Sequence, residues 1–469
     1  MLTRLEVDGF KNLVGFAINF GPFTCIAGPN GVGKSNIFDA IRFLSLLTDH
    51  TLTEAALQVR VSGGESNDMR DLFWSGADGH ADEFRIAAEM IVDPQVQDDF
   101  GRPAQATSTY LRYEIRIGYE QPTHRGRFGR LVLLSETLDY ITEGEAVQKL
   151  KFPHSARKFR GSVVDNDRRT SAGYISVKVA NDGQTEIVVH QEGKGGLGQT
   201  APAYTAPRTI IGTSNTSTTP TILAARREMQ KWNFLALEPS AMRKPDRFQS
   251  EPFITGSGGH LPATLLRLAT DAERQGDDPE SVYAAVANRL SELVHVDSLR
   301  VDVDEVRQLL TLEVQERGGI RLPASSLSDG TLRFLTLALL VADPQAQDLI
   351  CIEEPENGIH PAKMPEMVRL LKDFAVDPTD EPSLENPFRQ VIVATHSPVF
   401  VQLQDPNDLL VAIETRIKGS NGKPIRTLRC RPLDDTWRAN TGEPTVGMGA
   451  ILAYLSSPPN AQLALPILS

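Results

Sequence analysis

The stretch Gly28-Pro-Asn-Gly-Val-Gly-Lys-Ser35 fits the pattern G-x-x-x-x-G-K-[ST] and decides the fold predicted for this chain. Phe23 to Ala27 reads as a short apolar strand before it, and Ser35 to Leu47 as an amphipathic helix after it. Glycines let backbone N–H groups turn toward one anion, and the helix N-terminus adds partial positive charge. Lys34 would reach the β- and γ-phosphates of a nucleotide, and the Ser35 hydroxyl would ligate Mg²⁺. The flanking strand and helix disfavour the alternative, a chance match on a surface loop.

The bulk composition is that of an ordinary soluble globular protein. Of the 469 residues, 40% are hydrophobic and 23% are charged. No apolar run approaches the roughly 18 residues that span a bilayer, and the start, MLTRLEVDGF, has no signal-peptide pattern, so we expect no membrane association and a cytoplasmic protein. The net charge of -12 disfavours a general polyanion-binding surface but allows a local basic groove. Cys25, Cys351 and Cys430 have neither metal-ligand nor disulfide spacing, so we expect small core residues.

The apolar pattern along the chain predicts an α/β protein. Residues 2–27 predict two or three antiparallel strands. The Gly-, Ser- and Thr-rich stretch at about 190–220 predicts a flexible loop. Helical periodicity covers 221–232, 262–296, 328–341 and 361–374, and further strands are expected at 84–91, 111–118, 131–134, 299–303, 309–314, 348–352 and 391–394, with a final hairpin at 409–431.

Two polar segments follow apolar strands in the C-terminal third. Leu349-Ile-Cys-Ile-Glu-Glu354 ends in two carboxylates, and the carboxyl ends of parallel strands open into a ligand crevice. Glu353 is expected to hold Mg²⁺, and Glu354 to orient or deprotonate the attacking water. The alternative is an acidic pair that begins a helix. Thr395-His-Ser-Pro398 points His396 toward the same crevice, where it could contact the γ-phosphate, although a lone histidine is usually structural.

Leu327-Ser-Asp-Gly-Thr331 begins a long predicted helix before the acidic strand. Ser328 and Gly330 offer a hydroxyl and N–H groups at a positive helix end. The alternative is a plain N-cap made by Ser328 or Asp329.

These motifs, in this order, resemble the ABC-class ATPases of the RecF/SMC type. The resemblance is closer to the compact AAA-family ATPases related to the overcoming-lysogenization-defect (OLD) proteins. It implies a P-loop NTPase with an ABC-type head, in which a mixed central sheet is flanked by helices and joined by an antiparallel β subdomain and an inserted middle region. The residues that carry it are Phe10-Lys-Asn12, GPNGVGKSN, LSDGT, IEEPENGIHP and ATHSP.

The segments that resemble this family most strongly lie in two separate parts of the chain, so the resemblance implies an ATPase core that is split in sequence. We expect the ATPase core at 1–50 and 300–435, an inserted β-rich lobe at 51–220, a helical subdomain at 221–299 and a C-terminal tail at 436–469.

The resemblance also implies roles for single residues. In that family the signature of one protomer completes the ATP site of another in a head-to-tail dimer, so Ser328 and Gly330 would act on ATP held by the partner. Glu354 would carry hydrolysis, His396 would be the switch histidine, and Glu356-Asn-Gly358 would let the two sites sense each other. The expected cofactors are ATP and Mg²⁺, and the residues expected to bind them are Asn30, Gly31, Gly33, Lys34, Ser35, Asn36, Ser328, Gly330 and Glu353.

The chain departs from several relatives of this group. Glu353 and the pair Asp329-Gly330 replace the Asp and Gly-Gly usual in transporter subunits, which favours the RecF-like branch. No heptad pattern predicts the long coiled coil of SMC proteins. The last 70 or so residues lack the clustered carboxylates of a TOPRIM nuclease, so a separate effector is expected. Gln58 is not assigned as the glutamine loop of the family.

A basic cluster in the middle of the chain leaves DNA binding open. Phosphate contact and an ordinary solvated face are equally supported there. The function expected is an ATP-driven switch that controls a DNA-related, genome-maintenance or anti-phage process; the alternative is an ATP-dependent sensor of a foreign protein. The cluster comprises Arg112, Arg116, Arg125, Arg127, Arg130, Lys149, Lys151, Arg157, Lys158, Arg160, Arg168 and Arg169, and a weaker one comprises Arg226, Arg227, Arg243, Lys244 and Arg247.

Overall fold

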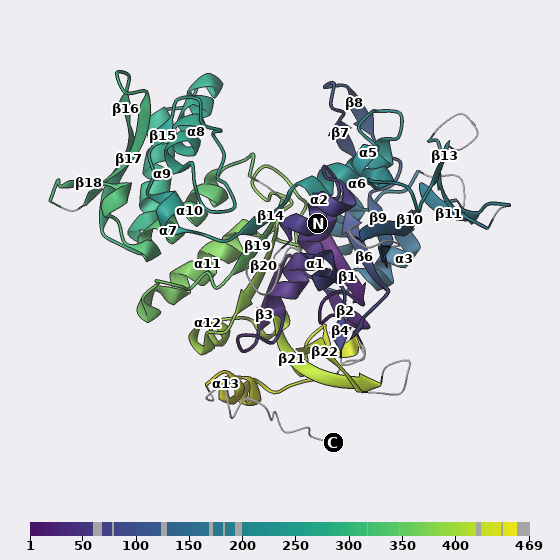
Figure 1. The fold of residues 1–469 in the computed structure, drawn as a ribbon. Coiled ribbons are helices and arrows are strands. Elements are labelled where there is room, and N and C mark those ends of the chain that lie inside the picture. Colours follow the sequence, from purple (N-terminus) through teal and green to yellow (C-terminus); the bar gives the residue numbers. More distant parts are fainter. Residues whose placement is uncertain are drawn as a thin grey trace.

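A six-stranded sheet forms the centre of the computed structural model (Figure 1). Its order is β14-β19-β20-β3-β21-β22; the first five strands in this order run parallel, and the edge strand β22 is antiparallel to β21. The strands are β14 (Trp232–Leu235), β19 (Leu349–Glu353), β20 (Gln390–Thr395), β3 (Phe23–Ala27), β21 (Leu409–Lys418) and β22 (Pro424–Pro432). The structure describes residues 1–59, 68–76, 79–122, 129–167, 172–181, 183–192, 199–316, 318–346, 348–418, 424–441 and 444–456.

Helices cover both faces of this sheet. Ile26, Cys351 and Ile392 face the core that contains α1 (Lys34–Leu46) and α6 (Pro220–Gln230). Alternate residues such as Cys25 and Val393 face the core formed with α10 (Asp329–Ala342), α11 (Met364–Phe374) and α12 (Pro398–Gln402). Burial on both faces explains why these strands read as continuous apolar runs. Cys25, Cys351 and Cys430 are buried on β3, β19 and β22, as predicted.

An eight-stranded sheet packs against α1 through the same core. Its recorded pairs are all antiparallel, in the order β13-β12-β11-β10-β9-β6-β1-β2. Its strands are β1 (Leu2–Asp8), β2 (Phe16–Asn19), β6 (Glu83–Ile91), β9 (Tyr110–Glu120), β10 (Arg130–Tyr140), β11 (Ile175–Val179), β12 (Thr185–Val189) and β13 (Gln199–Pro202). The prediction that Phe23–Ala27 continues the antiparallel strands of 2–27 is wrong. All five residues of β3 are buried, and the strand lies between β20 and β21 in the parallel sheet.

A third unit lies at the left of Figure 1, where a small sheet packs on two helices. It contains β15 (Asp246–Arg247), β16 (Val296–Asp304), β17 (Leu309–Glu316), β18 (Arg321–Pro323), α8 (Leu261–Gln275) and α9 (Pro279–Ser291). The expected helical segment 221–299 is therefore divided. β14 joins the parallel sheet because it pairs with β19, and β16 and β17 join this third unit because their hairpin packs on α9.

Short elements connect these units. They are α2 (Leu52–Gln58), η1 (Met69–Leu72), β4 (Ser75–Gly76), β5 (Gly79–His80), β7 (Gln95–Gln97), β8 (Pro103–Gln105), α3 (Glu143–Lys149), η2 (Ala156–Arg160), α4 (Gly161–Val163), α5 (Ile210–Thr213), α7 (Pro239–Met242), η3 (Ala324–Ser326), η4 (Pro361–Lys363), η5 (Pro406–Asp408), η6 (Ala439–Thr441) and α13 (Met448–Ser456).

The longest helix among the described residues is α8, with 15 residues, so these residues contain no long coiled coil. None of the helices in the described part of the chain has the length and apolar character of a membrane span.

The predicted flexible loop at about 190–220 contains ordered elements where the structure describes it. Residues 193–198 lie outside the described residues, but 199–202 form β13 and 210–213 form α5. Glu136, which is fully buried, accepts hydrogen bonds from the backbone N–H groups of Ile210 (2.6 Å) and Ile211 (2.9 Å). Thr209 Oγ1 donates to the carbonyl of Leu47 at the end of α1 (3.3 Å). These hydrogen bonds join residues 209–211 to distant parts of the chain, which explains why a segment predicted from its composition to be a flexible loop is ordered there.

Glu136 makes stability depend on pH. Burial raises its pKa to about 7, although the N–H groups of Ile211 and Ile210 and the Tyr113 hydroxyl lower it. The folded state therefore keeps a proton that the unfolded carboxyl, with a pKa of 4.5, releases. Its contribution to stability is complete below the unfolded pKa and is lost as the pH rises through the folded pKa.

We therefore expect Glu136→Gln to remove this pH dependence. Between about pH 4 and pH 8, the free energy of unfolding of the wild type should fall by about 3 kcal/mol relative to the variant. Urea denaturation at each pH measures this difference, with the exposed Glu305→Gln as a control that leaves the profile unchanged. A constant difference between wild type and Glu136→Gln would contradict the assignment.

Candidate nucleotide-binding site

The loop from Gly28 to Ser35 joins β3 to α1 and has the geometry of an anion cradle. Gly31 and Gly33 have φ values of 80° and 103°, which favour glycine. Gly33 is the N-cap of α1 and makes no side-chain capping hydrogen bond. The first turn of α1 thus has no side-chain acceptor at its positive end, which suits a phosphate.

Lys34 is buried under this loop. Its Nζ donates to the carbonyls of Gly28 (2.7 Å) and Pro29 (2.9 Å). Burial lowers the pKa of Lys34, while Glu354 and Glu353 raise it. The lysine therefore lies within the electrostatic influence of both acidic residues of β19, as the predicted site requires.

Asn12 supports the loop from the first hairpin, a role that sequence reasoning did not assign to it. Its Nδ2 donates to the carbonyl of Val32 (3.0 Å), and its Oδ1 accepts from Asn36 Nδ2 (2.8 Å). A Cβ on Gly33 would lie 2.2 Å from Asn12 Nδ2. Gly33 is thus required both for its φ and for the close approach of Asn12.

Asp39 is a second residue that sequence reasoning missed. It lines the cavity, and its Oδ2 lies 2.7 Å from Lys11 Nζ in an ion pair whose side chains are 7% and 6% exposed. Asp39 follows Ser35 by four residues on α1, so the helical i, i+4 spacing could have identified it. Phe10-Lys-Asn12 therefore contributes two side chains to the support of the site.

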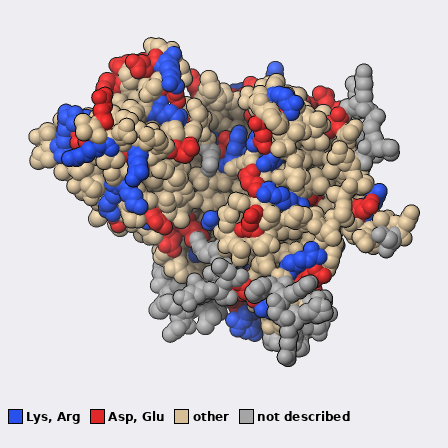
Figure 2. Space-filling model, turned by 45° about the horizontal axis from the view of Figure 1, so that its top comes forward, with Lys and Arg blue, Asp and Glu red and all other residues tan. Residues whose placement is uncertain are grey.

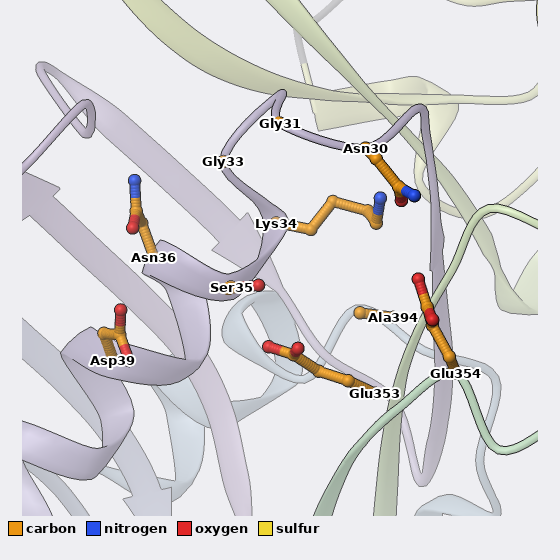
Figure 3. Close-up of a pocket in the computed structure, with 10 residues that line it drawn as sticks. All are labelled: Asn30, Gly31, Gly33, Lys34, Ser35, Asn36, Asp39, Glu353, Glu354 and Ala394. Atoms are coloured by element: carbon orange, nitrogen blue, oxygen red, sulfur yellow. The ribbon is translucent and has the colours of Figure 1, made fainter. Parts of the chain in front are cut away.

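The acidic end of β19 lies across the cavity from the loop. Glu353 and Glu354 approach from the strand end, and Lys34 extends toward Asn30 between the loop and Glu354 (Figure 3). The cavity has a volume of about 390 Å³. Its lining residues are Asn30, Gly31, Gly33, Lys34, Ser35, Asn36, Asp39, Glu353, Glu354 and Ala394.

Two side chains lie beside the Glu354 carboxylate, and one of them donates a hydrogen bond to it. Asn357 Nδ2 donates to its Oε2 (2.8 Å), and His396 Nδ1 lies 2.7 Å from its Oε1. The φ of Glu354 is 48°, a backbone conformation that is unfavourable for a residue with a side chain and is common at functional sites. His396 does not line the cavity but contacts the carboxylate that does.

Ser328 and Gly330 lie away from this cavity. Ser328 Oγ caps α10 by accepting from the Thr331 N–H (3.1 Å), so within one chain it acts as the N-cap. Arg243 Nη2 donates to the neighbouring carbonyl of Leu327 (3.0 Å). A Cβ on Gly330 would lie 2.2 Å from the Gly358 carbonyl oxygen, so the turn after β19 packs directly on α10. One chain does not bring its Ser328 and Gly330 to its own phosphate loop.

Basic residues of the predicted cluster that lie on the eight-stranded sheet form ion pairs with carboxylates. Arg112 contacts Glu6 (2.7 Å), Arg116 contacts Glu83 (2.5 Å) and Arg130 contacts Glu120 (2.5 Å). Figure 2 shows Lys and Arg interleaved with Asp and Glu over the face that it displays. Further pairs are Lys149–Glu89, Lys158–Asp380, Arg226–Asp49, Arg227–Asp99 and Arg243–Asp329, and Arg125, Arg127, Arg168 and Arg169 lie outside the described residues.

Gln58 ends α2 with its Nε2 3.3 Å from His50 Nε2 and does not line the cavity, so nothing supports a glutamine loop there.

The packing of Asn12 on the loop can be tested with two glycine variants. Gly33→Ala and Gly31→Ala both place a side chain at positive φ, but nothing lies within 4 Å of a Cβ on Gly31. Gly33→Ala must also displace Asn12, so its free energy of unfolding should fall by about 1–2 kcal/mol more. Thermal melting without nucleotide measures the difference, and equal losses in the two variants would contradict the role given to Asn12.

Comparison with known proteins matches both halves of the core. A family model described as "AAA domain, putative AbiEii toxin, Type IV TA system" matches residues 228–402, and one described as "AAA domain" matches residues 4–55. These ranges contain the phosphate loop, the signature, the acidic strand and His396.

Curated relatives match shorter segments. The chromosome partition protein Smc of Bordetella petrii is 36% identical over 118 residues, which is 24% of this chain and 9% of the relative. Structural maintenance of chromosomes protein 1 of Saccharomyces cerevisiae is 27% identical over 149 residues, 31% of this chain and 10% of the relative. The DNA replication and repair protein RecF of Parabacteroides distasonis is 39% identical over 54 residues, 11% of this chain and 15% of the relative. The chain thus spans a small part of each relative's length.

Among solved structures, an SmcHead bound to the C-winged helix domain of ScpA is 14% identical, with a TM-score of 0.47, and the likeness covers 92% of this chain and 98% of that chain. The assignment of the fold rests on the parallel sheet, the phosphate loop and the two matched segments. In these matched segments the chain is similar to ABC-class ATPases of the RecF/SMC group.

Proposed function

We propose that this protein binds and hydrolyses ATP with Mg²⁺ as a switch, and that two copies associate head to tail around two nucleotides. The closed assembly would control a DNA-related, genome-maintenance or anti-phage process in the cytoplasm through a separate effector. One observation carries the proposal: Lys34, Ser35, Glu353 and Glu354, far apart in sequence, line one cavity of about 390 Å³.

The residues of the cavity fit a nucleotide and its metal. The uncapped N-terminus of α1 and the Lys34 ammonium supply positive charge for phosphate oxygens. Ser35 and Glu353 offer the hydroxyl and carboxylate oxygens that Mg²⁺ prefers. When bound, ATP supplies the phosphoryl group and Mg²⁺ neutralises charge on it.

Glu354 would act as the general base. Its carboxylate reaches the cavity from the end of β19, opposite Lys34. Asn357 donates a hydrogen bond to one of its oxygens and His396 lies beside the other, so the carboxylate would be oriented to accept a proton from an attacking water. His396 follows the last residue of β20, and its Nδ1 lies 2.7 Å from the Glu354 carboxylate.

The placement of α10 supports association in trans. Ser328 and Gly330 begin a helix of 14 residues yet lie outside the cavity of their own chain. A second copy, arranged head to tail, would bring that helix end to the open side of the nucleotide. Each site would then be completed by its partner.

Glu354→Gln should separate nucleotide binding from hydrolysis. The amide keeps the shape of the side chain but is no general base, so ATP hydrolysis should fall at least about 100-fold while ATP binding persists. Mass photometry with ATP should then show dimers or larger assemblies.

Two further variants serve as controls. Lys34→Ala should lose ATP binding, and Ser328→Arg should bind ATP but stay monomeric because its side chain blocks the partner's site. Hydrolysis at the wild-type rate by Glu354→Gln would refute its role as the base, and a solitary, ATP-loaded Glu354→Gln protein would refute the dimer.

The alternative function, an ATP-dependent scaffold that senses a foreign protein without nucleic acid, is favoured by one observation. Arg112, Arg116, Arg130 and Lys149 each have a carboxylate partner. Phosphate contact there would require breaking these pairs, which weakens the case for DNA on this face.

Arg116 and its partner Glu83 provide a test, since their side chains are 46% and 44% exposed. Arg116→Ala should leave the affinity for duplex DNA within about 2-fold of wild type at 50 mM salt, whereas Glu83→Gln, which frees the arginine, should raise it. Fluorescence anisotropy over a salt titration measures both. A loss of affinity and a shallower salt slope in Arg116→Ala would restore a DNA-binding role to this face, and no binding by any variant would favour the scaffold.

A further inference from the structure

The hairpin of β21 and β22 continues beyond the central sheet. β21 pairs with β3 as far as Val411, opposite Ala27, but the strand itself runs to Lys418. Among the described strands, residues 412–418 pair with β22 alone, and at about 3.3 Å per residue they make a ribbon roughly 20 Å long. We call residues 412–418 and 424–430 the ribbon. Figure 1 shows β21 and β22 at the bottom of the molecule, extending past the other strands of the sheet.

One face of the ribbon changes from apolar to basic along its length. Near the base, Leu428 and Cys430 are buried in the core that contains α1. Because side chains alternate between the faces of a strand, Arg426 lies on the same face as Leu428, and Arg416 lies opposite Arg426 on β21. Lys418 follows Arg416 by two residues, and all three cations are exposed. The buried base therefore fixes three exposed cations on one face of the outer ribbon.

The charges of this face repel one another. Arg416 and Arg426 are directly opposite, and like charges in that position destabilise a pair of strands. The ribbon has four Arg or Lys residues and one carboxylate, Glu414, although the chain as a whole has a net charge of -12. Glu414 Oε1 lies 3.5 Å from Arg426 Nη1. Within the described part of the chain Arg416 and Lys418 have no ion pair, unlike the arginines of the eight-stranded sheet. A bound polyanion would relieve this repulsion.

The outer part of the ribbon is open to a partner. Close to the base, residues 12–14 cover β22, because the Leu428 N–H donates to the Asn12 carbonyl (3.2 Å) and the Thr427 hydroxyl to the Val14 carbonyl (2.9 Å). From 424 to 426, no hydrogen bond joins β22 to another described element than β21.

The shape and composition of the ribbon favour duplex DNA as that partner. The major groove of DNA admits a two-stranded β-ribbon, and Arg and Lys side chains pair with the phosphates that border it. The ribbon contains no aromatic residue, so it lacks the side chains on which the bases of a single strand stack.

We propose that the ribbon binds the phosphate backbone of duplex DNA through Arg416, Lys418 and Arg426. This inference goes beyond the proposed ATPase function, because none of the three residues lines the nucleotide cavity. The base of the ribbon nevertheless touches the phosphate loop, since a Cβ on Gly28 would lie 2.9 Å from the Ala412 carbonyl oxygen. DNA held by the ribbon would thus lie at the same edge of the sheet as the nucleotide.

Fluorescence anisotropy with a labelled duplex, in the absence of nucleotide, tests this role. Arg416→Gln with Arg426→Gln should weaken binding about 10-fold at 50 mM salt, and the slope of log affinity against log salt should become shallower by about 2. Arg416→Lys with Arg426→Lys keeps both charges and should bind within about 3-fold of wild type.

A second pair of variants controls for the loss of charge itself. Arg274 and Arg307 belong to the third unit, and their side chains are 76% and 78% exposed. Arg274→Gln with Arg307→Gln should leave the affinity for the duplex within about 2-fold of wild type. Melting temperatures show that each variant is folded, and the ribbon glutamine variant should melt no lower than wild type because it removes the repulsion.

Four results would overturn the inference. They are an unchanged affinity and slope in the ribbon glutamine variant, equal losses in the ribbon and control variants, no duplex binding by the wild type, and tighter binding of the single strand than of the duplex. Displacement of the duplex by polyglutamate at equal charge concentration would assign the ribbon to an acidic protein instead. A wild type that does not hydrolyse ATP would refute the proposed switch but leave this nucleotide-free measurement unaffected.

Discussion

The parallel pairing of β19, β20 and β3 is the constraint on which the site depends. Glu353 pairs with Ala394, and Thr395 pairs with Ala27, so the three strands end at the same level. Backbone hydrogen bonds continue past the strand ends, from Gly28 N–H to the Thr395 carbonyl (3.1 Å) and from Glu354 N–H to the Ala394 carbonyl (2.8 Å). The phosphate loop, the acidic pair and the His396 turn are therefore fixed relative to one another by backbone, before any side chain contributes.

Features that depend on neighbouring residues could be predicted from the sequence. The phosphate loop, the strand that ends in Glu353 and the helix after Ser328 each have a local pattern, and the structure contains all three elements. The ranges of β6, β9, β16, β17 and α11 follow from periodicity for the same reason. Strand ends in a parallel sheet share one edge, which is why His396 could be placed near Glu354 without a structure.

Features that depend on the pairing of segments far apart in the chain could not be predicted from the sequence. A five-residue apolar strand such as β3 fits an antiparallel hairpin and a parallel interior position equally well, and only its neighbours β20 and β21 decide. The same holds for Arg112, Arg116 and Arg130 of the eight-stranded sheet, each of which pairs with a carboxylate on another strand. Arg112 and Glu6 are 106 residues apart, so their pairing is invisible until the register is known. Asn12 lies between β1 and β2, outside the loop that it supports, so its role could not be predicted for the same reason.

The helix α1 has two attachment points with different chemistry. Its first residues carry the phosphate loop, and its C-terminal end is bonded to the segment around Thr209 that Glu136 of the eight-stranded sheet holds. With 13 residues it is a rod of about 20 Å. A displacement of the eight-stranded sheet at Glu136 would therefore be transmitted along a stiff helix to the Gly28–Ser35 loop.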